Sequence, residues 1–227
     1  MNEEKKIKIE KNGPYHVAGG VPLEKEFVVP DSNNDPLGWK KGEQYQTPQE
    51  YSLCRCGKSK SKPFCDGSHV KIDFDGTETA SKEKYDNQSE IIDGPEIDLK
   101  DAPRLCSRAR FCHRHGGTWD LTANSNDPEC KKDAIEEACN CMGGRLTAME
   151  KTGKAIEPDF VPSISVTEDI PAKVSGPLWV KGGIPIESAD GAVYEARNRQ
   201  AICRCGKSKN KPFCDGTHID IKFDDKV

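Results

Sequence analysis

The chain has 227 residues, and Leu, Ile, Val and Phe together make up roughly 18 % of them, which is a small share for a globular core. Its 34 basic and 38 acidic residues leave a net charge of −4, too small for charge-driven disorder or for the broad basic surface of a nucleic-acid-binding protein. The eleven cysteines are therefore the candidates for additional stabilisation, as disulfides or as metal ligands.

The N-terminal residues, MNEEKKIKIE, are charged throughout and lack the apolar stretch of a secretory signal. No apolar run in the chain is long enough to span a bilayer. We therefore predict a cytoplasmic protein that has no membrane partner and keeps its thiols reduced. Clustered cysteines in that compartment bind metal more often than they form structural disulfides.

An internal repeat organises the chain. Residues 54–69 read CRCGKSKSKPFCDGSH and residues 203–218 read CRCGKSKNKPFCDGTH, so only two of sixteen positions differ. A second shared segment precedes each copy, GPYHVAGGVPLE at 13–24 and GPLWVKGGIPIE at 176–187. Because the whole unit is duplicated, we predict one domain at 1–77, its counterpart at 161–227, and an unlike segment at 78–160 between them.

The elements expected between these landmarks are short. Gly and Pro punctuation favours brief strands, and alternating apolar residues favour a half-buried strand after each motif. Asp127 and Pro128 are typical of a helix N-cap and first turn, and Gly143-Gly144 is a stop signal. In chain order we predict strands at 26–30 and 70–76, a polar linker at 76–89, a helix from 128, and strands at 163–169 and 219–225.

Each copy of the motif carries a complete set of metal ligands at the spacing C-x-C-x8-C-x3-H. The ligands are Cys54, Cys56, Cys65 and His69 in the first copy, and Cys203, Cys205, Cys214 and His218 in the second. Asp66-Gly67 can begin a helix that carries His69 back toward Cys65. On spacing alone, a zinc site that stabilises a small fold is as good an interpretation as a redox centre.

Both copies closely resemble the signature of the CDGSH iron–sulfur domain family. The resemblance implies two [2Fe-2S] clusters, each held through iron by three cysteines and one histidine. It also implies a small β-rich fold in which two such units pair. We therefore expect a mainly β protein with short helices (α+β). In it the two units form an intramolecular pseudo-dimer, beside a small middle domain with one helix, and the chain is otherwise a monomer.

The middle segment contains the other five cysteines. It resembles a divergent ferredoxin-like domain that has a C-x5-C pair followed by CPSG(R/A)L, although Met142-Gly143 stand here in place of Pro-Ser. A third iron–sulfur cluster, such as [4Fe-4S], is one interpretation; structural zinc, disulfides or no metal are the others. The proposed ligands of that cluster are Cys106, Cys112, Cys139 and Cys141, while Cys130 is interpreted as a spare thiol.

The function expected from these sites is that of a soluble electron carrier or redox sensor. Reduction of a [2Fe-2S] centre held by three thiolates changes its charge from −1 to −2, so proton uptake at the histidine should accompany electron uptake. The chain shows no nucleophile elbow, phosphate loop or dinucleotide fingerprint. It is thus expected to be a non-catalytic protein, able to serve as an accessory to an oxidoreductase.

Two other functions remain open. The first is iron–sulfur cluster transfer or assembly, because a single histidine ligand favours release to an apo acceptor. The second is a zinc-binding structural scaffold. The expected partners are redox proteins or apo iron–sulfur acceptors, and not nucleic acid.

Overall fold

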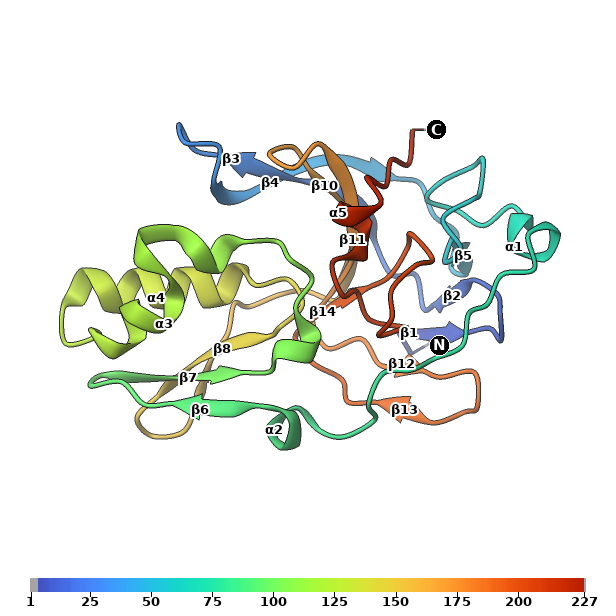
Figure 1. The fold of residues 1–227 in the computed structure, drawn as a ribbon. Coiled ribbons are helices and arrows are strands. Elements are labelled where there is room, and N and C mark those ends of the chain that lie inside the picture. The colour runs from blue at the N-terminus through green and yellow to red at the C-terminus, as the bar shows by residue number, and fades with distance from the viewer. Residues whose placement is uncertain (1–3, 227) are drawn as a thin grey trace.

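The computed structural model describes residues 4–226, and strands outnumber helices in it (Figure 1). Strands make up 31 % of the chain and helices 18 %, which confirms the predicted mainly β, α+β class. Within the described residues, none of the helices has the length and apolar character needed to cross a membrane.

Two five-stranded sheets form the main body. The first has the spatial order β13 (Val193–Tyr194), β12 (Ile186–Glu187), β1 (Lys6–Ile9), β2 (Tyr15–Ala18) and β5 (Tyr51–Leu53). The second has the order β4 (Pro36–Tyr45), β3 (Leu23–Pro30), β10 (Ser163–Asp169), β11 (Val174–Lys181) and β14 (Arg199–Ile202). Strands β3 and β10 confirm the predicted strands at 26–30 and 163–169.

The two halves of the chain exchange hairpins. Strands β12 and β13 of the second half extend the first sheet, where β1 and β12 run parallel with Ile7 beside Ile186. Strands β3 and β4 of the first half extend the second sheet in the equivalent place, with Leu23 beside Ile164. Each half therefore completes the sheet of the other, which confirms the intramolecular pseudo-dimer.

One apolar core joins the two sheets. Its members come from both halves of the chain, and the four residues at the parallel junctions are at most 1 % exposed. All eight residues of β11 are buried, while β1 alternates exposed and buried residues. A chain with few large apolar residues can thus still form a core, because both halves contribute to the same one.

The middle segment forms its own layer beside this body. A four-stranded sheet of β6 (Glu90–Ile92), β7 (Ile97–Asp101), β8 (Leu146–Glu150) and β9 (Ala155–Ile156) is covered by α4 (Pro128–Asn140). The predicted N-cap is confirmed, because Asp127 Oδ1 accepts a hydrogen bond of 2.8 Å from the backbone N–H of Glu129. A second helix, α3 (Thr118–Ala123), packs on α4 and was not predicted, because its N-cap, Gly117, offers no capping side chain.

The strands predicted directly after each motif are wrong. Residues 68–71 and 217–220 form the short helices α1 (Ser68–Lys71) and α5 (Thr217–Asp220), and an irregular segment follows each. In the first copy the side chains of Val70 and Ile72 are exposed, and only Phe74 is buried, against Cys54 and Cys56. The apolar alternation that predicted a strand therefore leaves two apolar side chains on the surface.

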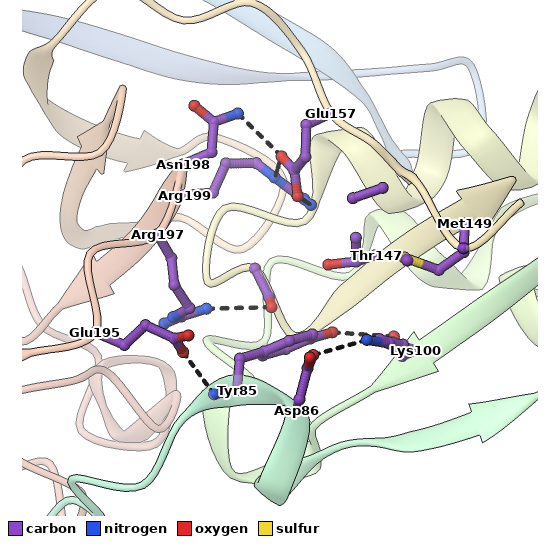
Figure 2. A pocket seen from close by; sticks show the side chains of 13 residues that line it. Tyr85, Asp86, Lys100, Thr147, Met149, Glu157, Glu195, Arg197, Asn198 and Arg199 are labelled. Carbon is purple, nitrogen blue, oxygen red and sulfur yellow. Dashed lines mark hydrogen bonds and ion pairs between the residues drawn. The ribbon is translucent and has the colours of Figure 1, made fainter.

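The linker ties the middle segment to the second half. It carries α2 (Tyr85–Gln88), and the backbone N–H groups of Thr79 and Ala80 both donate to Lys211 O. Where the linker, the middle segment and the second half meet, they line an open pocket of about 340 Å³ (Figure 2). The backbone N–H of Tyr85 donates to Glu195 at its edge. Short 3-10 turns at Pro103–Leu105 and Phe111–Gly116 complete the segment.

A buried carboxyl in α4 makes stability depend on pH. The Glu137 side chain is fully buried; Thr118 Oγ1 donates to it at 2.7 Å, and His115 Nδ1 lies 3.9 Å from its other oxygen. Burial raises the pKa of Glu137 to about 7. The folded protein therefore keeps a proton that the unfolded chain loses near pH 4.5, and stability should fall as pH rises from there through 7.

Glu137→Gln should remove this loss because the amide stays neutral and can still accept from Thr118. We expect the variant to be more stable than the parent by about 2–3 kcal/mol at pH 8 and nearly equal at pH 4.5. Denaturant unfolding at the two pH values measures the difference. Glu129→Gln, on the exposed start of the same helix, should stay within about 0.5 kcal/mol at both; an equal effect of the two variants would contradict the assignment.

Candidate metal centres

Each CDGSH-type motif folds into a loop held by the same set of short-range bonds. The N–H of Cys54 donates to Pro63 O at 2.8 Å, and the carboxylate of Asp66 accepts from the N–H groups of Lys60 and Ser68 at 2.8 and 2.9 Å. The helix predicted to start at Asp66-Gly67 is present as α1, and it places His69 next to Cys65. The second copy repeats these bonds through Cys203, Asp215, Lys209 and Thr217.

The four ligand atoms of each motif lie in two pairs. In the first copy, Cys54 Sγ is 3.8 Å from Cys56 Sγ, and Cys65 Sγ is 3.4 Å from His69 Nδ1. The corresponding distances in the second copy, Cys203 to Cys205 and Cys214 to His218, are 3.7 and 3.3 Å. Two thiolates that share one tetrahedral metal ion lie about 3.8 Å apart when the metal–sulfur bonds are about 2.3 Å.

The donor set fits a centre with two metal positions. Among residues 4–226, no group of three or more His, Cys, Asp or Glu side chains converges closely enough to hold one metal ion. Each motif instead offers one sulfur–sulfur pair and one sulfur–nitrogen pair. Thiolates and imidazole are the ligands that iron–sulfur centres of the [2Fe-2S] type use.

One cysteine of each C-x-C pair is prepared to ionise. The hydrogen bond from the Cys56 thiol, helped by backbone N–H groups of residues 57–59, lowers the pKa of Cys54 to about 6 although burial opposes it. The same arrangement around Cys203 lowers its pKa to about 6. A thiolate is the form of cysteine that binds metal, so the loops favour the ligand state.

The two centres lie back to back. An alanine Cβ at Gly57 would come within 2.6 Å of Cys205 O, and one at Gly206 within 2.5 Å of Cys56 O. Both glycines have φ near +75°, a conformation that residues with a side chain avoid. Glycine is therefore required at each position for two reasons. One is the turn after the C-x-C pair, and the other is the close contact between the two loops.

The surroundings of the two histidines differ. His69 is partly exposed, whereas His218 is 3 % exposed and packs among Ser107, Ala109 and Met142 of the middle segment. Burial lowers the pKa of His218 to about 4. The middle segment thus covers the second centre and leaves the first one open.

Two arginines inside the motifs are structural. Arg55 and Arg204 are 1 % and 3 % exposed, and their guanidinium groups donate to buried acceptors. Arg55 donates to Gly76 O, and Arg204 donates to Thr167 O at 2.8 Å and pairs with Glu168 at 3.0 Å. They fasten the loops to the strands behind them.

Three of the four cysteines proposed for a third centre gather in one hollow. Cys106, Cys112 and Cys141 line it together with Arg145. Burial, followed by the neighbouring Cys141 and Cys106, raises the pKa of Cys112 to about 12. Cys139 is not part of this hollow, because its Sγ faces Ile156 O at 3.7 Å.

Cys130 lies in the first turn of α4, away from this hollow, and packs near Ile97 of β7 and Ala134 of α4.

Some supporting residues could not be found from the motif alone. The hydroxyl of Tyr15, in the first half, donates to Cys203 O at 2.8 Å and so supports the second centre. Arg199, 1 % exposed, donates to the backbone around Cys139 and Cys141. Both act across the fold, and only the exchange of hairpins and the docking of the middle segment bring them into place.

Comparisons with known proteins agree with this geometry. The profile described as iron-binding zinc finger, CDGSH type, matches residues 12–70 and 175–219. The profile described as divergent 4Fe-4S mono-cluster matches residues 92–151. Neither curated proteins nor solved structures give a significant match. The chain therefore contains two regions of the CDGSH-type iron-binding family, and they flank a region of the divergent 4Fe-4S family.

Proposed function

We propose that the chain is a non-catalytic electron carrier with two [2Fe-2S] clusters, one in each CDGSH-type motif. The observation that carries the proposal is the pairing of ligand atoms, at 3.7–3.8 Å between sulfurs and 3.3–3.4 Å between sulfur and Nδ1, in two loops that touch each other. When bound, such a cluster supplies a one-electron couple. The two loops touch each other, so two such couples would lie close together.

A third centre in the middle segment supports the same function. The region matches a 4Fe-4S profile and gathers Cys106, Cys112 and Cys141 around one hollow. Ser107 and Ala109 line both this hollow and the small pocket at His218, so the hollow lies beside the second motif. Three neighbouring redox centres in one chain suit a protein that accepts electrons at one surface and delivers them at another.

The direct test is the metal content of anaerobically purified protein. We expect brown protein with about eight iron and eight sulfide per chain, four of each from the two [2Fe-2S] clusters and four from a [4Fe-4S] cluster. A colourless sample that holds zinc would overturn the proposal and favour a structural scaffold.

The histidines should couple proton uptake to reduction. Nδ1 faces Cys65 in His69 and Cys214 in His218, so Nε2 is in each ring the nitrogen that can exchange a proton when the charge of a bound centre changes. His69 is the partly exposed ring of the two. The potential of the parent should therefore fall as pH rises, by up to about 59 mV per unit. In His69→Cys/His218→Cys, a fourth thiolate should lower the potential and remove this slope. An unchanged slope in redox titrations of the double variant would contradict proton uptake at histidine.

Cluster transfer is the second candidate, and the open first centre favours it. Cys65 and His69 are partly exposed, so an acceptor can reach that centre, whereas Cys214 and His218 are buried. Mixing holo protein with an apo ferredoxin separates the two functions, because an electron carrier keeps its iron while a transfer protein loses it.

A further inference from the structure

The middle segment covers one of the two equivalent surfaces. At Gly216, beside the second histidine, an alanine Cβ would lie 2.1 Å from Cδ of Arg108. At Gly67, the equivalent position in the first copy, such a Cβ would meet nothing within 4 Å. In Figure 1, α1 stands at the edge of the molecule far from the middle segment. The same surface thus binds a protein segment in one copy and is open in the other.

The middle segment covers the second copy and not the first because the two copies carry different residues at the contact positions. Asp220 accepts a 2.7 Å hydrogen bond from Arg108 Nη1, and the residue in its place in the first copy is Lys71. Asn210 Nδ2 donates to Arg104 O at 2.8 Å, and its counterpart is Ser61, which cannot reach as far. The second copy has the residues that hold the basic segment, and the first copy carries a positive charge where the acceptor would be.

The open face of the first copy is the exposed surface of α1 and of the loop before it, and it carries both apolar and basic side chains. We define this face by Val70 and Ile72, which are 75 % and 47 % exposed, and by the exposed lysines Lys58, Lys60 and Lys71. Exposed apolar side chains beside charged ones occur on surfaces that bind other proteins.

The acidic residues of this stretch offset only part of its positive charge. The carboxylate of Asp66 accepts hydrogen bonds from two backbone N–H groups of its own loop. Asp73 is the other acidic residue between positions 58 and 73, where four lysines lie.

We propose that this open face docks an external redox protein with an acidic surface, a proposal that rests on the proposed electron-carrier function. In the second copy an arginine meets an aspartate at this position. In the first copy Lys71 reverses the sign and so selects carboxylates and repels a basic segment. Val70 directly follows His69 in α1 and is exposed, so a partner docked there would lie next to a ligand of the first centre. The second centre then exchanges electrons within the chain, and the first centre exchanges them with an external protein.

The test measures binding of the holo protein to a strongly acidic [2Fe-2S] ferredoxin by anaerobic titration calorimetry at low salt. Lys71→Asp gives the first copy the residue type of the second and should weaken binding at least tenfold. Val70→Ser should weaken it several-fold. Lys222→Asp makes the same change of charge at an exposed site near α5 and should alter binding less than twofold.

Equal weakening by Lys71→Asp and Lys222→Asp would overturn the proposal, as would tighter binding to basic cytochrome c. A dimer of the chain that Lys71→Asp dissociates, measured by sedimentation, would also overturn it. The visible spectrum of the same samples keeps the two proposals apart. A colourless sample refutes the carrier function, whereas a coloured and reducible sample that does not bind the ferredoxin refutes only the docking face.

Discussion

Cys141→Ser should lose the third centre while Cys139→Ser retains it. The sulfur of Cys141 lines the hollow with Cys106 and Cys112, whereas that of Cys139 faces Ile156 O and lies near Arg199 and Glu157. We expect Cys141→Ser to lower the iron content by about four per chain. Cys139→Ser should leave iron and sulfide unchanged.

The side chains of Cys139 and Cys141 point in different directions because of helix geometry. Cys139 lies in the last turn of α4 and Cys141 is its C-cap, and side chains two positions apart on a helix do not face each other. In Cys54-Arg55-Cys56 the same spacing lies in a tight loop, which brings the sulfurs to 3.8 Å. The C-x-C pattern therefore has opposite consequences in the two settings.

Iron and sulfide analysis of anaerobically purified variants checks this expectation, with Cys130→Ser as the matched control. The absorption of the two [2Fe-2S] centres should persist in all three variants and shows that they are folded. Loss of the third centre in Cys139→Ser but not in Cys141→Ser would show that the cluster binds on the other side of the helix end.

The sequence predicts the candidate site best where a motif is repeated. Sixteen residues with two differences predict both ligand sets, and hydrogen bonds within each loop, such as those of Asp66 and Asp215, shape it locally. The helix N-cap at Asp127 could be predicted for the same reason, because the backbone N–H groups that donate to it belong to residues two and three positions later. Predictions succeeded where the stabilising contacts are local.

Contacts across the fold could not be predicted in this way. No periodicity in β3 indicates that it pairs with β10 of the other half, because a parallel junction leaves no local signal. The apolar residues at 70 and 72 predicted a strand, although they lie exposed in and after α1. Their alternation does not reflect burial in this fold, and it coincides with the open face that we propose for docking.

The unequal burial of the two centres also depends on tertiary structure. The two motifs have nearly identical sequences, yet Cys214 is 2 % exposed and Cys65 is partly exposed. The difference comes from the middle segment, which Arg110 and Asp169 fasten to the second sheet through two hydrogen bonds of 2.8 Å. One duplicated motif thereby acquires two environments.

Arg199→Met should be the most destabilising single change at the junction of the middle segment and the second half. The guanidinium is 1 % exposed and donates to the carbonyls of Ala138, Cys141 and Leu146. It also forms a double interaction with Glu157, at 2.6 and 2.7 Å, which Figure 2 shows from the pocket side. The side chain thus caps the C-terminal end of α4 and neutralises a half-buried carboxylate.

Because methionine leaves those carbonyls and Glu157 without their donor, we expect a loss of about 3–5 kcal/mol. Thermal unfolding should shift down by about 10 °C or more. Arg199→Met/Glu157→Gln removes the unpaired charge as well and should recover part of the loss, while Arg104→Met on an exposed turn should change stability by less than about 0.5 kcal/mol. If Arg199→Met is as stable as the parent, the middle segment is held to the second half by other contacts.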